Sequence, residues 1–124
     1  MGWTDPGTTN QYAIYGCYFH GTGSNTCTGT TNFAPVGTPD AGAGVWGQLD
    51  LVGNVWQWTM DWETGYVIPC SDCAYLTDAG GLTLQALRGG NLNRPEQSLT
   101  PWNLQGYAPN SRLYTYGVRC ARSP

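Results

Sequence analysis

Charge is scarce in this chain of 124 residues, and lysine is absent altogether. The five basic residues are all arginines, set against eight carboxylates and a single histidine, so the net charge at pH 7 is −3. A surface that binds nucleic acid needs a basic stripe, and this sequence has none. We therefore expect no nucleic-acid partner.

Long apolar runs are also missing. No stretch of about eighteen apolar residues appears, so the sequence predicts no membrane-spanning helix. Met1 does not begin a charged and then apolar leader, although a longer natural chain could carry one upstream. We expect no membrane partner.

Turn-forming residues dominate and predict loops and short strands. Residues 5–31 and 35–44 are rich in glycine, threonine and asparagine, which is typical of turns. Short strands are expected at 54–59, 84–88 and 117–121, each bounded by turn formers. Only 82–87 and 97–104 could pass for helix, and Pro101 interrupts the second of these.

The five cysteines favour an oxidising compartment. Cys17 and Cys27 bracket a flexible loop that a disulfide could close, and Cys70 and Cys73 flank a tight turn that could hold a second bridge, which leaves Cys120 over. Zinc ligation is a weaker alternative because only one pair has the short C-x-x-C spacing, and no strand-to-helix pattern supports a thioredoxin-like motif. We expect an extracytoplasmic or secreted protein.

The segment 46–62 is the most specific stretch, with four tryptophans, two glycines and spaced oxygen donors. If residues 53–58 are extended, Gly53 and Val55 direct backbone carbonyls to one point. The Asp50 carboxylate and the Gln57 amide oxygen could reach the same point. Calcium accepts such a mixture of ligands, so the spacing predicts a hard-cation site at these four residues. The alternative is that the tryptophans are core residues and Asp50 caps a turn.

No catalytic constellation stands out. The single histidine, His20, has no carboxylate or cysteine near it in sequence, and Ser98 and Ser111 lack the context of a nucleophile elbow. We interpret Asp61 and Glu63 as solvated carboxylates. The pattern therefore predicts no catalytic residue.

Four blocks in order resemble the signature of the formylglycine-generating enzyme (sulfatase-modifying factor) family. They are Ala34-Pro35-Val36-Gly37, the run 46–62, the block Leu87-Arg88-Gly89-Gly90, and the block 117–122 that includes Gly117-Val118-Arg119. The resemblance implies an α+β fold with low regular secondary structure, a variant of the C-type lectin fold. The blocks cover about the C-terminal half of a family domain, so we expect residues 1–124 to be that half and the fold to be incomplete.

The resemblance also implies functions residue by residue. Family positions matching Asp50, Gly53, Val55 and Gln57 bind structural calcium, although the family usually has glutamate where this chain has Gln57. The family's enzymes bind copper(I) through two cysteines shortly after the Arg-Gly-Gly block, and soft thiolates suit copper(I). Those positions fall near Arg94 and Leu99, and residues 91–119 contain no cysteine. The family's chemistry therefore has no site here.

Residues 91–116 are rich in the side chains that recognition surfaces favour. In the family this region frames the substrate groove, and the variable proteins of diversity-generating retroelements use a similar fold with varied residues before a terminal Gly-x-Arg block. The predicted ligand-binding residues are Asn91, Asn93, Arg94, Trp102, Tyr107, Arg112 and Tyr114. The alternative is that the aromatic residues fill a core with few helices.

These observations predict a bacterial, non-catalytic, calcium-stabilised domain that serves binding or structure. Its partner would be an unidentified ligand, another protein or a second copy of the chain. The alternative is a fragment related to the oxidase that converts a substrate cysteine to formylglycine.

Overall fold

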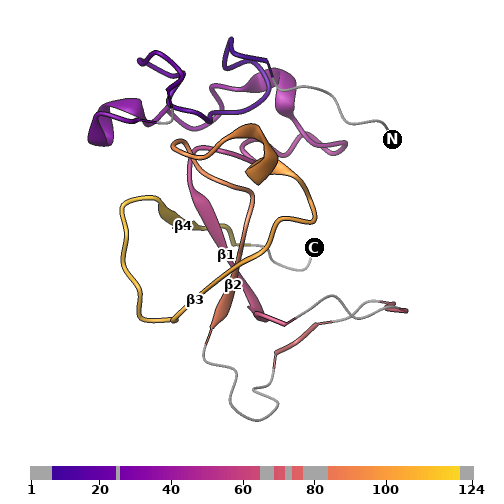
Figure 1. Cartoon of the computed structure of the whole chain (residues 1–124). Helices are drawn as coiled ribbons and strands as arrows, with labels where there is room; N and C mark the ends of the chain where they lie inside the picture. Colours follow the sequence, from indigo (N-terminus) through magenta and orange to yellow (C-terminus); the bar gives the residue numbers. More distant parts are fainter. Residues whose placement is uncertain (1–6, 25, 65–68, 72–73, 77–83, 121–124) are drawn as a thin grey trace.

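The computed structural model describes residues 7–24, 26–64, 69–71, 74–76 and 84–120. At its centre is a four-stranded sheet in the order β3-β2-β1-β4 (Figure 1). The strands are β1 (Trp56–Trp62), β2 (Gln85–Arg88), β3 (Gln105–Tyr107) and β4 (Tyr116–Val118). Helical structure in the described residues consists of three short 3-10 helices, η1 (Gly29–Asn32), η2 (Asp40–Gly42) and η3 (Glu96–Leu99).

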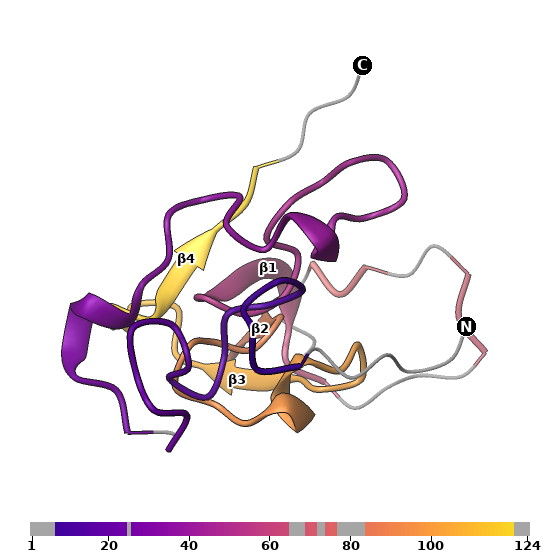
Figure 2. The ribbon, with the colours of Figure 1, turned by 90° about the horizontal axis from the view of Figure 1, so that it is seen from above.

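The sheet is mixed, and β1 is its hub. β1 pairs antiparallel with β2, with Trp58 opposite Leu87, and parallel with β4, with Trp56 opposite Tyr116. β2 pairs antiparallel with β3, so β3 and β4 form the two edges (Figure 2). Tryptophan and threonine supply most of β1, and these residue types favour a pleated, half-buried strand.

Residues 7–50 have little regular structure and pass over one end of the sheet (Figures 1 and 2). The core lies where this segment meets the chain after β2. Ile14 and Ala34 pack with Leu92, which is fully buried. The Cys17 N–H donates to the Leu92 carbonyl at 2.7 Å, so backbone pairing reinforces the apolar contact.

The expected strands are found with changed limits. β2 lies within the predicted 84–88, whereas the strand predicted at 54–59 begins at Trp56 and runs on to Trp62. The extended conformation expected from residue 53 is wrong at its start, because Gly53 and Asn54 have φ of 81° and 60° and form a turn. For the strand predicted at 117–121, β4 covers Tyr116–Val118, and residue 121 lies outside the described residues.

Neither of the two segments that could pass for helix forms an α-helix in its described residues. Residues 85–87 belong to β2, and within 97–104 only residues 97–99 are helical, as part of η3. No helix among the described residues has the length and hydropathy needed to cross a bilayer. A small mixed sheet with few helices is compatible with the predicted α+β class.

Candidate cation site and aromatic cavity

The turn at Gly53 and Asn54 places the candidate cation ligands. The Gly53 N–H donates to the Gly89 carbonyl at 2.7 Å, and Gly53 forms a parallel bridge with Ile14. The Asn54 amide side chain clamps Ala34 by accepting from its N–H at 3.2 Å and donating to its carbonyl at 3.0 Å. The turn is therefore fixed from three sides.

Asp50 approaches this turn in a left-handed conformation, with φ of 55°. Its Oδ2 accepts a hydrogen bond from the Gly37 N–H at 2.7 Å. Its Oδ1 is buried and has no hydrogen-bond partner among the described residues. An unpaired buried carboxylate oxygen is costly, so this atom is suited to a cation.

Gln57 completes the set from the start of β1. Its Nε2 donates to the Asp50 carbonyl at 2.7 Å, which turns Oε1 toward Arg119. Arg119 donates from Nε to that Oε1 at 3.2 Å and from Nη2 to the Asp50 carbonyl at 3.0 Å. Arg119, which belongs to the fourth signature block but was not predicted to lie at the cation site, thus shares the candidate ligands.

One cavity of about 280 Å³ brings these residues together. It is lined by Val36, Asp50, Gly53, Asn54, Val55, Gln57, Val118 and Arg119. No group of three or more histidine, cysteine, aspartate or glutamate side chains within the described ranges could hold a metal. The oxygen set here instead combines one carboxylate, one amide and backbone carbonyls, and the free Asp50 Oδ1 makes it fit a hard cation such as calcium.

The cysteines agree with the predicted pattern as far as they are described. Cys17 and Cys27 form a disulfide with a Cα–Cα distance of 5.1 Å. Cys70 is disulfide-bonded, and Cys73, its predicted partner, lies outside the described residues. Cys120 is exposed and free.

A second cavity, of about 560 Å³, lies between the sheet and the loop that joins β3 to β4. We call it the aromatic cavity. It is lined by Trp58, Gln85, Pro109, Ser111, Arg112, Leu113, Tyr114, Tyr116, Gly117 and Val118. Trp58 and Tyr116 meet edge to face, with ring centroids 5.5 Å apart.

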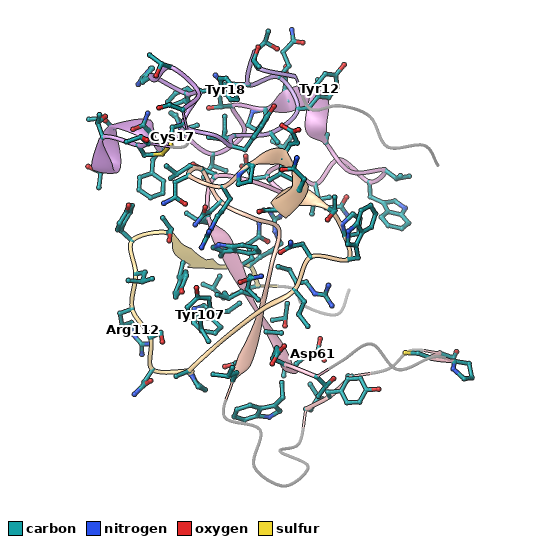
Figure 3. The ribbon with its side chains drawn as sticks, in the orientation of Figure 1. Tyr12, Cys17, Tyr18, Asp61, Tyr107 and Arg112 are labelled. Atoms are coloured by element: carbon teal, nitrogen blue, oxygen red, sulfur yellow. A yellow bond between two sulfur atoms is a disulfide. The ribbon has the colours of Figure 1, made fainter. Side chains whose placement is uncertain are left out.

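Some of the predicted ligand-binding residues gather at this cavity. Arg112 and Tyr114 line it, and the Tyr107 ring lies 5.2 Å from that of Tyr116. Figure 3 shows Tyr107 in the space between the sheet and the loop that carries Arg112. Tyr114 also packs edge to face on Phe33, with centroids 5.9 Å apart.

The other predicted ligand residues do not line the aromatic cavity. Asn91 is 3% exposed, and its Oδ1 accepts from the Asn93 N–H at 3.3 Å, so Asn91 supports the backbone. Trp102 is 66% exposed, and Arg94 is exposed while its carbonyl accepts from the Gly16 N–H at 2.9 Å. The predicted set is thus divided between a cavity, an exposed surface and a buried backbone contact.

Tyr116 is electrostatically unusual. Burial raises the pKa of its phenol to about 12, and the neighbouring Tyr107 adds to the rise while Arg94 opposes it. The phenol therefore stays neutral throughout the physiological range and acts as part of an aromatic wall. Local sequence does not indicate this wall, because Tyr107, Tyr116 and Trp58 come from three different strands.

Leu99 and Arg94 lie near the positions at which the resemblance implies copper-binding thiolates. Leu99 ends η3 and is 4% exposed, packed in a core cluster with Ala13 and Tyr15. Arg94 is exposed on the preceding loop. One position thus holds an apolar core side chain and the other a cationic surface side chain.

The described residues form a small mixed sheet surrounded by turns, with an oxygen-lined cavity at a Gly-Asn turn. The family model for the sulfatase-modifying factor enzyme 1-like domain matches residues 4–124. The chain therefore belongs to this family. A comparison with curated proteins finds no match.

Proposed function

We propose that the chain is a non-catalytic, calcium-stabilised recognition domain of the sulfatase-modifying-factor type. The observation that carries the proposal is Leu99, which is 4% exposed in the core and lies near a position where the resemblance implies a copper-binding thiolate in the family's enzymes. A leucine side chain has no thiolate and therefore cannot bind copper(I). Membership of the family without these thiolates favours binding over oxidation.

Calcium has a structural role in this proposal. The ligands are Asp50, Gly53, Val55 and Gln57, and the buried, unpaired Asp50 Oδ1 supports the assignment. A bound cation would join the turn before β1 to the loop that carries Asp50. Since it binds only to the folded chain, it stabilises the fold by mass action.

Recognition is assigned to the region around β4. The aromatic cavity combines aromatic walls with the Gln85 amide and the Arg112 guanidinium. Such a mixture brings contact area at low entropic cost and adaptable hydrogen bonding. The Cys17–Cys27 disulfide supports an extracytoplasmic or secreted location, and the low content of regular structure is in keeping with a C-type lectin-like variant.

The test is an attempt to observe the chemistry that the proposal denies. The folded protein is incubated with oxygen, copper(I) and a sulfatase-type cysteine peptide, and formylglycine is sought by mass spectrometry. We expect no conversion above a control without protein. Conversion that persists in Cys120→Ser, which removes the exposed free thiol, would overturn the non-catalytic assignment.

A further inference from the structure

β4 is an edge strand whose outer side is open. The Trp56 N–H donates to the Thr115 carbonyl at 2.8 Å, which directs the backbone groups of Thr115 toward β1. Backbone groups of alternate residues point to the same edge of a strand, so those of Gly117 also face β1. The groups of Tyr116 and Val118 therefore point away from the sheet.

Few of these outward groups are used. The Tyr116 N–H donates to the Leu113 carbonyl at 3.0 Å, within the loop. The Tyr116 carbonyl and both backbone groups of Val118 have no hydrogen-bond partner in the part of the chain that the structure describes. An edge with unpaired donors and acceptors is a template for another strand.

The aromatic cavity lies along this same edge. All three β4 residues line it, and its walls are mainly apolar, with Trp58, Leu113 and Tyr114 among them. Val118 is 73% exposed, so the strand is accessible from solvent. An added strand would place alternate side chains on the cavity face, because side chains of a strand alternate between faces.

The described lining of the cavity carries charge of one sign. Arg112 is the one charged residue among the described residues that line it. Its Nη1 donates to the carbonyls of Pro109 and Ser111, both at 3.1 Å, which holds the guanidinium on the loop. Its Nη2 and Nε have no hydrogen-bond partner among the described residues and remain for an anionic group.

We propose that β4 pairs with an extended segment of a partner protein that places an apolar side chain and, two residues on, a carboxylate in the aromatic cavity. The Tyr116 carbonyl and the Val118 N–H and carbonyl supply the main-chain pairing. The apolar side chain packs against Trp58 and Tyr116, and the carboxylate binds Arg112. Main-chain bonds give such a complex its affinity, and the cavity gives it its specificity.

The proposal rests on the recognition role proposed above, but not on calcium or on the lack of oxidase chemistry. The probe is a blocked, fluorescently labelled peptide of sequence Thr-Leu-Thr-Glu-Thr-Leu, titrated by anisotropy against the whole chain. Matched peptides carry glutamine or lysine in place of glutamate. We expect the glutamate peptide to bind roughly tenfold more tightly than the glutamine peptide, as for one charge-assisted hydrogen bond.

Arg112→Gln tests the charge. In this variant the glutamate and glutamine peptides should bind equally, because the discriminating guanidinium is gone. Trp46→Ala is the control, since Trp46 is 86% exposed and does not line the cavity. Equal binding of both peptides to the wild type, or discrimination that persists in Arg112→Gln, overturns the role of Arg112.

Val118→Pro tests the backbone. Proline removes the outward N–H of Val118 and leaves the Gly117 groups that face β1, and edge strands tolerate proline. We expect at least a roughly tenfold loss of affinity with an unchanged melting temperature.

Two peptides with N-methyl groups on alternate residues provide a test that does not depend on the variant folding. Only the analogue methylated on the edge that faces β4 should lose binding. Loss in both analogues, or in neither, contradicts strand pairing.

A dimer of the free chain that Val118→Pro dissociates would also overturn the proposal, because a second copy would then fill this edge. If the peptide fails to bind while calcium still stabilises the chain and no formylglycine forms, only this inference falls.

Discussion

The guanidinium of Arg119 donates from Nε to Oε1 of Gln57 at 3.2 Å, across 62 residues of sequence. The residue after β4 is thereby tied to the start of β1, beside the candidate cation ligands. Gln57 stands where the family usually has glutamate, so the pair is a neutral amide with a cation rather than two opposite charges. Arg119 and the proposed calcium ion would therefore compete for the same oxygen.

Calcium should raise the melting temperature of the wild type, and a chelator should reverse the rise. At free calcium roughly a hundredfold above Kd, mass action adds about 2.7 kcal/mol to the free energy of unfolding. Asp50→Asn should abolish the response, because it removes the one charged ligand while it can still accept from the Gly37 N–H. Asp40→Asn removes an equal charge from the exposed start of η2 and should keep the response. Scanning calorimetry with and without chelator measures these melting temperatures. A wild-type melting temperature that the chelator leaves unchanged would contradict the calcium site.

Relieving the competition at Gln57 should strengthen calcium binding. Arg119→Gln removes a positive charge and frees Gln57 Oε1, so the calcium Kd should fall roughly tenfold, as for the loss of one charge-assisted hydrogen bond. Gln57→Glu should lower Kd in the same direction by adding a charged ligand. Isothermal titration with calcium measures both values. A Kd that rises in Arg119→Gln would mean that the guanidinium supports the ligand geometry instead of competing for it.

The residues in these two predictions differ in whether their place at the candidate site could be predicted from the sequence. That Asp50, Gly53, Val55 and Gln57 lie close together could be predicted, because all four fall within eight consecutive residues, where spacing limits the geometry, and they do line one cavity. Arg119 could not, since its contact depends on the parallel pairing of β1 with β4. The short edge strand β3 was missed for a related reason. Its three residues include Gly106, and its pairing with β2 is a tertiary contact that local propensity does not report.

Burial also separates residues of the region 91–116 that their composition does not distinguish. Asparagine and tyrosine in a turn-rich stretch favour a recognition surface, and Arg112 and Tyr114 do line a cavity. Asn91 is also an asparagine of this stretch, but it is buried, and its Oδ1 accepts a hydrogen bond from the Asn93 N–H. Residue type alone cannot separate an amide that faces a ligand from one that supports the chain.

Alkaline pH should destabilise the fold through Tyr116. Its folded pKa of about 12 lies above the ordinary value of 10.0, so folding favours the neutral phenol. The stability from this group is fully present below pH 10 and is lost as the pH rises from 10 toward 12. Tyr116→Phe should therefore flatten the fall of the melting temperature across that window. Tyr114→Phe, which removes a phenol on a side chain that is 56% exposed, should leave the slope unchanged. Equal slopes in the wild type and Tyr116→Phe would exclude Tyr116 as the cause.

Gly53→Ala should be far more damaging than Gly47→Ala, although both glycines have a left-handed φ, of 81° and 78°. The left-handed strain costs roughly 1–2 kcal/mol at either position. At Gly47 a Cβ would meet nothing within 4 Å, so the strain is the whole cost. At Gly53 a Cβ would lie 2.5 Å from the Ile14 carbonyl oxygen and 2.9 Å from the Ile14 nitrogen, and backbone atoms cannot yield as a flexible side chain can.

We therefore expect Gly53→Ala to lose more than about 3 kcal/mol of unfolding free energy in urea titrations, against about 1–2 kcal/mol for Gly47→Ala. The clash also pushes the turn away from Ile14 and with it the Gly53 carbonyl, so Gly53→Ala should bind calcium more weakly while Gly47→Ala keeps the wild-type Kd. If the two variants proved equally stable, the close approach of Gly53 to Ile14 could not be what fixes the cation site.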